Sequence, residues 1–126
     1  MRILVTGSKG FIGSNLVVRL SEMAAYEVLG FDYEDSLAEL EEKVCRADAV
    51  IHLAGVNRPK DVKEFETGNA DLTARLCDLI AATGRRIPLI LSSSVQAGLA
   101  NPYGESKLAA EHAAEALAEN TGNPVM

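Results

Sequence analysis

The sequence predicts an α/β protein built on a doubly wound parallel β-sheet. Short segments rich in Val, Ile and Leu alternate along the chain with longer segments of helical periodicity. The short segments are continuously apolar, which is typical of strands whose two faces are both covered. Alternation of this kind favours parallel strands joined by right-handed crossover helices.

Each expected element has its own local signals. Four short apolar segments, bounded by glycine or polar residues, are expected to form strands: residues 2–6, 27–31, 49–53 and 89–92. The first helix is expected over residues 11–24, with an apolar stripe at helical spacing. Its stripe consists of Ile12, Leu16, Val17, Leu20 and Met23.

The later helices have recognisable ends. Ser36 and Glu39 have the spacing of a capping box and predict a helix from residue 37. Further helices are expected over residues 71–83 and 102–121, followed by Gly84 and Gly122, which suit helix C-caps. Residues 123–126 resemble the start of another strand. We therefore expect residues 1–126 to be a single truncated domain, the N-terminal fragment of a longer protein.

Composition limits the possible partners. The chain has 126 residues, 48% apolar and 24% charged, which is typical of one globular domain. Its net charge of −6 argues against nucleic acid as a partner. No apolar run approaches the length of a membrane span, and the N-terminus is unlike a signal peptide, so we expect a cytoplasmic protein. Cys45 and Cys77 lack metal-site or redox spacing and are expected to be reduced and packed on helices.

A glycine loop, VTGSKGFIG, covers residues 5–13 between the first strand and the first helix. Gly7, Gly10 and Gly13 would allow a tight turn, close approach of a pyrophosphate and close helix–strand packing. The helix N-terminus would add N–H donors and positive partial charge. In this position the loop predicts a Rossmann-type dinucleotide site. The alternative is a tight turn that binds nothing.

Two charged residues bear on the choice of cofactor. Asp32 follows the second strand, where a carboxylate accepts hydrogen bonds from the ribose hydroxyls and repels a 2′-phosphate, which favours NAD. Lys9, within the glycine loop, could instead meet the 2′-phosphate of NADP or be a solvated lysine. The expected cofactor is NAD or NADP, with a preference for NAD.

Tyr103 and Lys107 are four residues apart at the start of the last helix, so they share one face. An ammonium beside a tyrosine hydroxyl favours the phenolate, which produces a proton donor and acceptor usable near neutral pH. Ser92-Ser93-Ser94 precedes them at the end of a strand, where such sheets bind ligands. Elsewhere, a Tyr–Lys pair at this spacing is usually a solvated surface pair.

Together these motifs resemble the extended short-chain dehydrogenases/reductases, the NAD-dependent epimerase/dehydratase family. The resemblance rests on TGSKGFIG (6–13), DAVIHLAG (48–55), Asn69, SSS (92–94) and YGESK (103–107). Within the family, HLAGVNRP (52–59), LSSSVQA (91–97) and NPYGESK (101–107) are most similar to the reductase domain of the bifunctional capsular polysaccharide UDP-sugar reductase/epimerase.

The resemblance implies a role for each matching residue. Tyr103 would be the acid/base, Lys107 would assist it and bind the nicotinamide ribose, and Ser94 would bind the sugar carbonyl. Arg58 is a candidate contact to substrate phosphate, and a homodimer through the helices at 71–83 and 106–119 is implied. The remaining cofactor contacts would be Gly7, Lys9, Gly10, Phe11, Ile12, Gly13, Asp32, His52, Leu53, Ala54, Gly55 and Ser92.

The implied reaction is NADPH-dependent reduction of the 4-keto group of a UDP-6-deoxy-N-acetylhexosamine, for polysaccharide precursors. Asp32 departs from that cofactor preference, and the downstream segment that completes the sugar site is missing. We therefore expect this fragment to hold a cofactor without turnover. A 4-epimerase with bound NAD and a non-catalytic NAD(P)-binding sensor are the alternatives, whereas Val95-Gln96 after Ser94 argues against dehydration. No residue cluster predicts a metal site.

Overall fold

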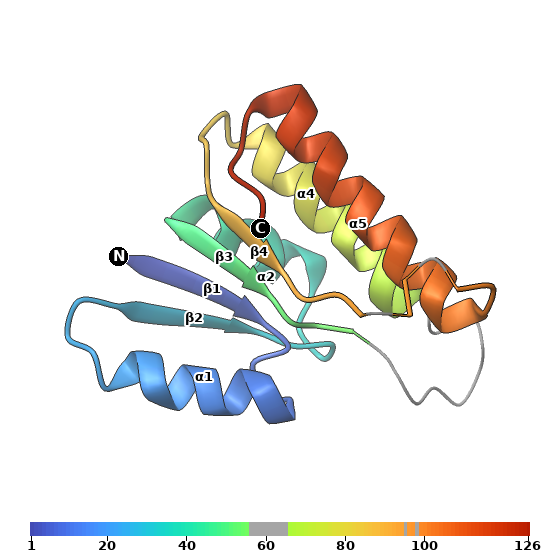
Figure 1. The fold of residues 1–126 in the computed structure, drawn as a ribbon. Coiled ribbons are helices and arrows are strands. Elements are labelled where there is room, and N and C mark those ends of the chain that lie inside the picture. The colour runs from blue at the N-terminus through green and yellow to red at the C-terminus, as the bar shows by residue number, and fades with distance from the viewer. Residues whose placement is uncertain (56–65, 95, 98) are drawn as a thin grey trace.

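The computed structural model describes residues 1–55, 66–94, 96, 97 and 99–126. Its strands form one parallel sheet in the order β2-β1-β3-β4. The helices include α1 on one face of the sheet and α4 and α5 on the other (Figure 1). The strands are β1 (Arg2–Thr6), β2 (Glu27–Phe31), β3 (Ala49–His52) and β4 (Leu89–Leu91). The helices are α1 (Phe11–Ser21), α2 (Leu37–Arg46), the π-helix η1 (Glu66–Asp71), α4 (Leu72–Ala82) and α5 (Pro102–Thr121).

The main core lies between the sheet and helices α2, α4 and α5. The strand register places four buried residues side by side in one row across the sheet, so their side chains point to the same face. These are Leu29, Leu4, Val50 and Leu89. The helices complete the core with Leu40 and Val44 of α2, Leu76 and Ile80 of α4, and Leu117 of α5.

The opposite face of the sheet is covered unevenly. Helix α1 contacts β1 and β2. On this face, exposure therefore increases along the neighbouring row of side chains. Val5 is 0% exposed, Ile51 is half-buried and Ile90 is 45% exposed. The expectation that both faces of every strand are covered is thus wrong for β4 in the described structure.

Helix α1 also differs from its prediction. It ends at Ser21 rather than residue 24, so Met23 lies in the following turn and is exposed. Ile12, in the first turn of the helix, is also exposed. Three residues of the expected stripe, Leu16, Val17 and Leu20, are half-buried.

The predicted helix caps are confirmed. Ser36 Oγ accepts a hydrogen bond from Glu39 N at 3.2 Å, and Ser36 N donates to Glu39 Oε2 at 2.9 Å. Helix α5 begins and ends as expected, with Gly122 in the left-handed conformation at its C-cap, φ +74°. Helix α4 is one residue shorter at each end than expected, and β3 and β4 each end one residue earlier.

Three smaller expectations, on residues 123–126, the two cysteines and a membrane span, can also be compared with the structure. Val125 forms a parallel bridge with Leu89, as expected for the start of a further strand. Cys77 is buried, but Cys45 is exposed on α2, so the expectation that it is packed is wrong. Within the described ranges, no helix is both long and apolar enough to cross a bilayer.

Candidate functional site

A cleft of about 540 Å³ opens where the strands end and the helices α1 and α5 begin. Segments that are far apart in the sequence meet here because the carboxyl ends of parallel strands lie at one edge of the sheet. The loop after β1, the ends of β3 and β4, and the first turns of α5 all contribute. The lining residues are Gly7, Gly10, Phe11, Ile12, Gly13, Leu53, Gly55, Ser92, Ser93, Tyr103 and Lys107.

Close backbone packing explains two glycines of the loop. Gly7 has φ +72°, and a Cβ there would lie 2.8 Å from Ala54 N. A Cβ at Gly13 would lie 1.9 Å from the Gly7 carbonyl oxygen. The loop can therefore lie against both the end of β3 and the start of α1 only if these two positions lack side chains.

The N-terminus of α1 faces the cleft with backbone donors. Gly10 is its N-cap and provides no side chain to accept hydrogen bonds from the first N–H groups. Gly10, Phe11 and Ile12 line the cleft at this end. Uncapped N–H groups and the positive end of the helix dipole favour a phosphate or other anion here.

Lys107 enters the cleft from the opposite side, on α5. Its ammonium donates a hydrogen bond to the Ser92 carbonyl oxygen at 3.1 Å, and its side chain is largely buried. Burial lowers the pKa of Lys107, and the nearby carboxylate of Glu111 opposes that change. Tyr103, one turn earlier on the helix, lines the same cleft. The structure thus brings the predicted Tyr–Lys pair and the glycine loop together.

The start of α5 is fixed in place by Gly104, which sequence reasoning did not single out. A Cβ at Gly104 would lie 2.2 Å from the Gln96 carbonyl oxygen and 2.9 Å from that of Leu99. Asn101, the N-cap, accepts a hydrogen bond from Gly104 N at 2.7 Å. The helix can therefore start directly against the preceding loop, which sets where Tyr103 lies.

A buried hydrogen-bond chain lies beneath the cleft and contains His52. Thr73 Oγ1 donates its proton to the Asn69 carbonyl oxygen at 2.6 Å, so it must accept from His52 Nε2, 2.8 Å away. Thr6 Oγ1 accepts from Ala54 N at 3.2 Å and donates to His52 Nδ1. A neutral His52 ring with its proton on Nε2 satisfies both contacts. Burial, with a smaller contribution from the Lys107 charge, lowers its pKa to about 4. His52 is 1% exposed and lies outside the lining of the cleft, so its expected contact with the cofactor stays a prediction.

The polar contacts continue to α5 through Asn69. Its side-chain amide donates to Ser106 Oγ at 2.9 Å, and Ser106 Oγ donates to the Tyr103 carbonyl oxygen at 2.8 Å. Asn69 and Ser106 are both buried. Asn69 belonged to the resemblance without a role, and Ser106 was not singled out. Ser106 could have been found as a small polar residue on the face of α5 that also carries the buried Ala110 and Ala114.

Several predicted site residues lie outside the lining of the cleft. Ser94 Oγ accepts a hydrogen bond from Gln96 N at 3.1 Å, and Ser93 lines the cleft instead. Ala54 supports the glycine loop through its contact with Gly7. Arg58 lies outside the described residues. The cofactor and substrate roles assigned to these positions stay predictions.

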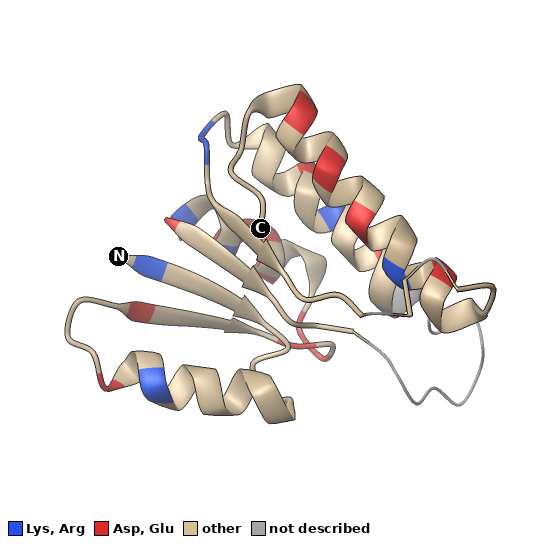
Figure 2. Ribbon diagram, in the orientation of Figure 1, with Lys and Arg blue, Asp and Glu red and all other residues tan. Residues whose placement is uncertain are grey.

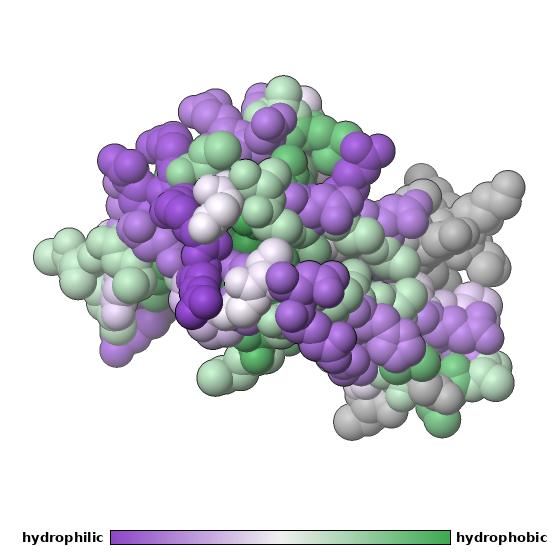
Figure 3. Space-filling model, turned by 90° about the horizontal axis from the view of Figure 1, so that it is seen from above, coloured by the Kyte–Doolittle hydropathy of each residue, from purple (hydrophilic) through white to green (hydrophobic). Residues whose placement is uncertain are grey.

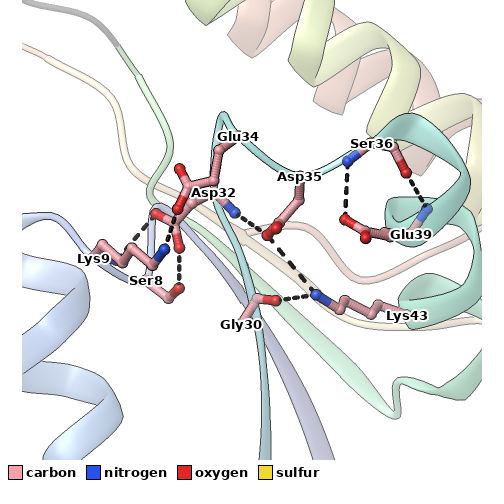
Figure 4. A network of polar contacts seen from close by, with 9 residues as sticks. All are labelled: Ser8, Lys9, Gly30, Asp32, Glu34, Asp35, Ser36, Glu39 and Lys43. Atoms are coloured by element: carbon pink, nitrogen blue, oxygen red, sulfur yellow. Dashed lines mark hydrogen bonds and ion pairs between the residues drawn. The ribbon is translucent and has the colours of Figure 1, made fainter.

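Lys9 and Asp32 form a polar network beside the cleft (Figure 4). Asp32 is 7% exposed and accepts hydrogen bonds from the Ser8 hydroxyl and, at 3.0 Å, from Lys9 N. The Lys9 ammonium pairs with the Glu34 carboxylate. Asp32 thus holds the glycine loop against the end of β2.

Among the described residues, no three His, Cys, Asp or Glu side chains are grouped to hold a metal ion.

Known proteins similar to this chain include enzymes that act on nucleotide sugars. A UDP-2-acetamido-2,6-beta-L-arabino-hexul-4-ose reductase from Pseudomonas aeruginosa is 46% identical over 125 residues, 99% of this chain and 34% of that protein. The crystal structure of capsular polysaccharide assembling protein CapF from Staphylococcus aureus has a TM-score of 0.84 at 40% identity, covering 99% of this chain and 34% of CapF. The chain thus spans about a third of the length of these two relatives.

A UDP-glucuronic acid 4-epimerase from Bacillus cereus, solved in complex with NAD, shares the fold at 24% identity and a TM-score of 0.86. It covers 99% of this chain, which covers 55% of the epimerase. The sequence profile that matches residues 3–126 includes every element that forms the cleft. Since that profile describes NAD dependent epimerases and dehydratases and extends over nearly the whole chain, the protein belongs to the NAD dependent epimerase/dehydratase family.

Proposed function

We propose that this chain is the cofactor-binding and acid–base part of an NAD-dependent oxidoreductase that reduces the 4-keto group of a nucleotide sugar. The substrate class we propose is a UDP-6-deoxy-N-acetylhexosamine, used for surface polysaccharide precursors. One observation carries this proposal: the glycine loop and the pair Tyr103–Lys107 line the same cleft.

The residues present fit a dinucleotide. Gly7 and Gly13 leave room for a close backbone turn, and the start of α1 offers N–H donors to the pyrophosphate. The cleft volume of about 540 Å³ lies within the usual range for small-molecule sites. Phe11 and Ile12 add apolar surface at its rim. When bound, the reduced cofactor would supply hydride to the sugar carbon.

Tyr103 would donate a proton to the sugar oxygen during reduction. Lys107 would help because its ammonium, held at the Ser92 carbonyl oxygen, stabilises the phenolate that remains. The polar contacts from Asn69 through Ser106 to the Tyr103 carbonyl oxygen would keep the tyrosine in position. Ser94 is our candidate for binding the sugar carbonyl, and Arg58 for binding substrate phosphate.

We further propose that sugar contacts come from sequence beyond these 126 residues, because the two relatives are about three times as long. Calorimetry with ADP-ribose tests the cofactor site on this chain alone. We expect binding, and we expect Gly13→Ala to abolish it. Gly84→Ala is the matched control, because it strains a left-handed glycine, φ +70°, at the end of α4 instead of in the loop. Absence of binding by wild type would refute the proposed site.

The chemical role of Tyr103 is tested in a longer, active form of the protein. We expect Tyr103→Phe to reduce kcat by roughly a hundred- to ten-thousand-fold, the usual contribution of general acid–base catalysis, with cofactor affinity retained. Retention of more than about a tenth of kcat would exclude Tyr103 as the acid, given that range. Consumption of one reduced cofactor per sugar would separate reduction from epimerisation.

We also propose a homodimer through α4 and α5. A groove between these helices is lined by four alanines and by Cys77, Asp78, Leu117, Asn120 and Thr121. Small residues allow helices of a second copy to approach closely. Figure 3 views the molecule from above in Figure 1, the side on which α4 and α5 lie, and shows hydrophobic and hydrophilic residues mixed there. Light scattering should give twice the chain mass, and Ala116→Glu should give a monomer.

A further inference from the structure

A network of charged residues lies where β2 ends (Figure 4), next to the glycine loop that lines the cleft. We call it the β2 rim and define it as Ser8, Lys9, Asp32, Glu34 and Asp35. It contains three carboxylates and one ammonium. Acidic residues gather in the loop after β2 in Figure 2. The local charge of the β2 rim is therefore negative.

The Lys9 ammonium is held within this rim. It pairs with Glu34, and its side chain is 73% exposed. The pKa of Lys9 is raised, chiefly by the hydrogen bond and the charge of Glu34, with Asp32 and Asp35 adding to the effect. Lys9 is therefore a cation near neutral pH whose charge is largely offset by neighbouring carboxylates.

Lys43, which reaches the rim from α2, is also engaged. Its ammonium donates to the Gly30 carbonyl oxygen at 2.6 Å and lies 3.9 Å from Asp35 Oδ2. The Asp35 carboxylate also accepts a hydrogen bond from Asp32 N at 2.9 Å. These contacts keep the Lys43 charge on the α2 side of β2.

The position of this rim matters for cofactor choice. In folds with a glycine loop of this kind, the adenosine ribose lies beside the end of the second strand. If the cleft binds a dinucleotide as proposed, the 2′ position of that ribose faces the β2 rim. A 2′-phosphate would bring up to about two negative charges toward the carboxylates, whereas a 2′-hydroxyl could donate a hydrogen bond to one of them.

We propose that Glu34 is a specificity-determining residue, which excludes a 2′-phosphate by keeping the Lys9 ammonium paired. This inference rests on the proposed function, since it concerns the same cofactor site. Asp32 repels a 2′-phosphate as well, but it is buried and also holds the glycine loop through Ser8 and Lys9 N. Glu34 is the exposed residue that controls whether the loop's cation can reach a ligand.

The experiment compares two probes, ADP-ribose and 2′-phospho-ADP-ribose, by calorimetry on the 126-residue chain at low salt. Variants are Glu34→Gln, Lys9→Gln and the double variant. Glu22→Gln is the matched control, because it removes the same charge from an exposed ion pair, with Arg19 on α1. We expect Glu34→Gln to improve binding of the phosphorylated probe relative to ADP-ribose by about three- to tenfold, in the range of a surface charge contact. Glu22→Gln should change the ratio of the two probe affinities by less than about twofold, because Glu22 lies outside the β2 rim.

The double variant isolates the part played by Lys9. If Glu34 acts by holding Lys9, Glu34→Gln should improve the ratio much less when Lys9 is already glutamine. The inference would be overturned if Glu34→Gln improved relative binding of the phosphorylated probe equally with Lys9 and with glutamine at position 9. It would also be overturned if Glu34→Gln and Glu22→Gln gave the same ratio of probe affinities. If wild type binds neither probe, the proposed function fails, and this inference fails with it. ADP-ribose binding with an unchanged ratio overturns the inference alone.

Discussion

Acidification should destabilise this fold through His52. The folded chain keeps this histidine neutral because burial, with a smaller contribution from the Lys107 charge, lowers its pKa from 6.5 to about 4. The unfolded chain binds a proton there near pH 6.5, so stability is complete above that pH and is lost as pH falls toward 4. Because the pKa differs between the unfolded and the folded chain, the free energy of unfolding should fall by about 2 kcal/mol between pH 7 and pH 5.

Urea unfolding followed by circular dichroism measures this loss at each pH. Carboxylates also titrate in this range, so the informative quantity is the difference between wild type and His52→Gln. We expect His52→Gln to be less stable at pH 7 but to lose about 2 kcal/mol less on acidification, since it has no imidazole to protonate. His112→Gln, which replaces an exposed histidine on α5, should keep the wild-type pH profile. Equal losses in wild type and His52→Gln would refute the reasoning.

Three further predictions concern the start of α5 and are measured by urea unfolding at pH 7. Gly104→Ala should lower the free energy of unfolding by about 1–3 kcal/mol, because its Cβ would overlap the Gln96 carbonyl oxygen; an unchanged stability would contradict the 2.2 Å approach. Ser106→Ala should cost about 1–3 kcal/mol by removing the hydroxyl partner of buried Asn69, whereas Ser14→Ala, at an exposed hydroxyl, should cost under about 0.5 kcal/mol. Asn101→Ala should cost about 1 kcal/mol as the loss of an N-cap, and the exposed Asn120→Ala is its control; equal effects would argue against the cap.

Local patterns in the sequence were sufficient for most of the fold. Helix α5 was predicted from end to end because Pro102 at its start and Gly122 at its end leave little choice of boundary. Strands β1 and β2 were equally clear, being short apolar runs that stop at Gly7 and Asp32. The predictions were wrong where tertiary contacts determine burial and element ends. Helix α1 is an example, because it has more apolar residues than the sheet can cover.

The candidate site was only partly predictable, and for a similar reason. Spacing along α5 is enough to place Tyr103 and Lys107 on one face of a helix. It says nothing of Gly104, whose importance depends on how close the loop at Gln96 and Leu99 approaches. The Asp32 carboxylate was expected to face a ribose, yet which donors lie around it depends on how the Ser8 loop folds back on β2.

The sheet gives the cleft two walls of unequal stability. β1 carries the glycine loop, pairs with a strand on each side and has Leu4 and Val5 at 0% exposure, so its amides should exchange with solvent only on global unfolding. β4 leads into Ser92 and has Ile90 at 45% exposure, so its amides should exchange through local opening at lower free energy. A ligand that contacts both walls would therefore slow hydrogen exchange mainly in β4 and the serines after it, because these residues open locally at lower free energy than β1.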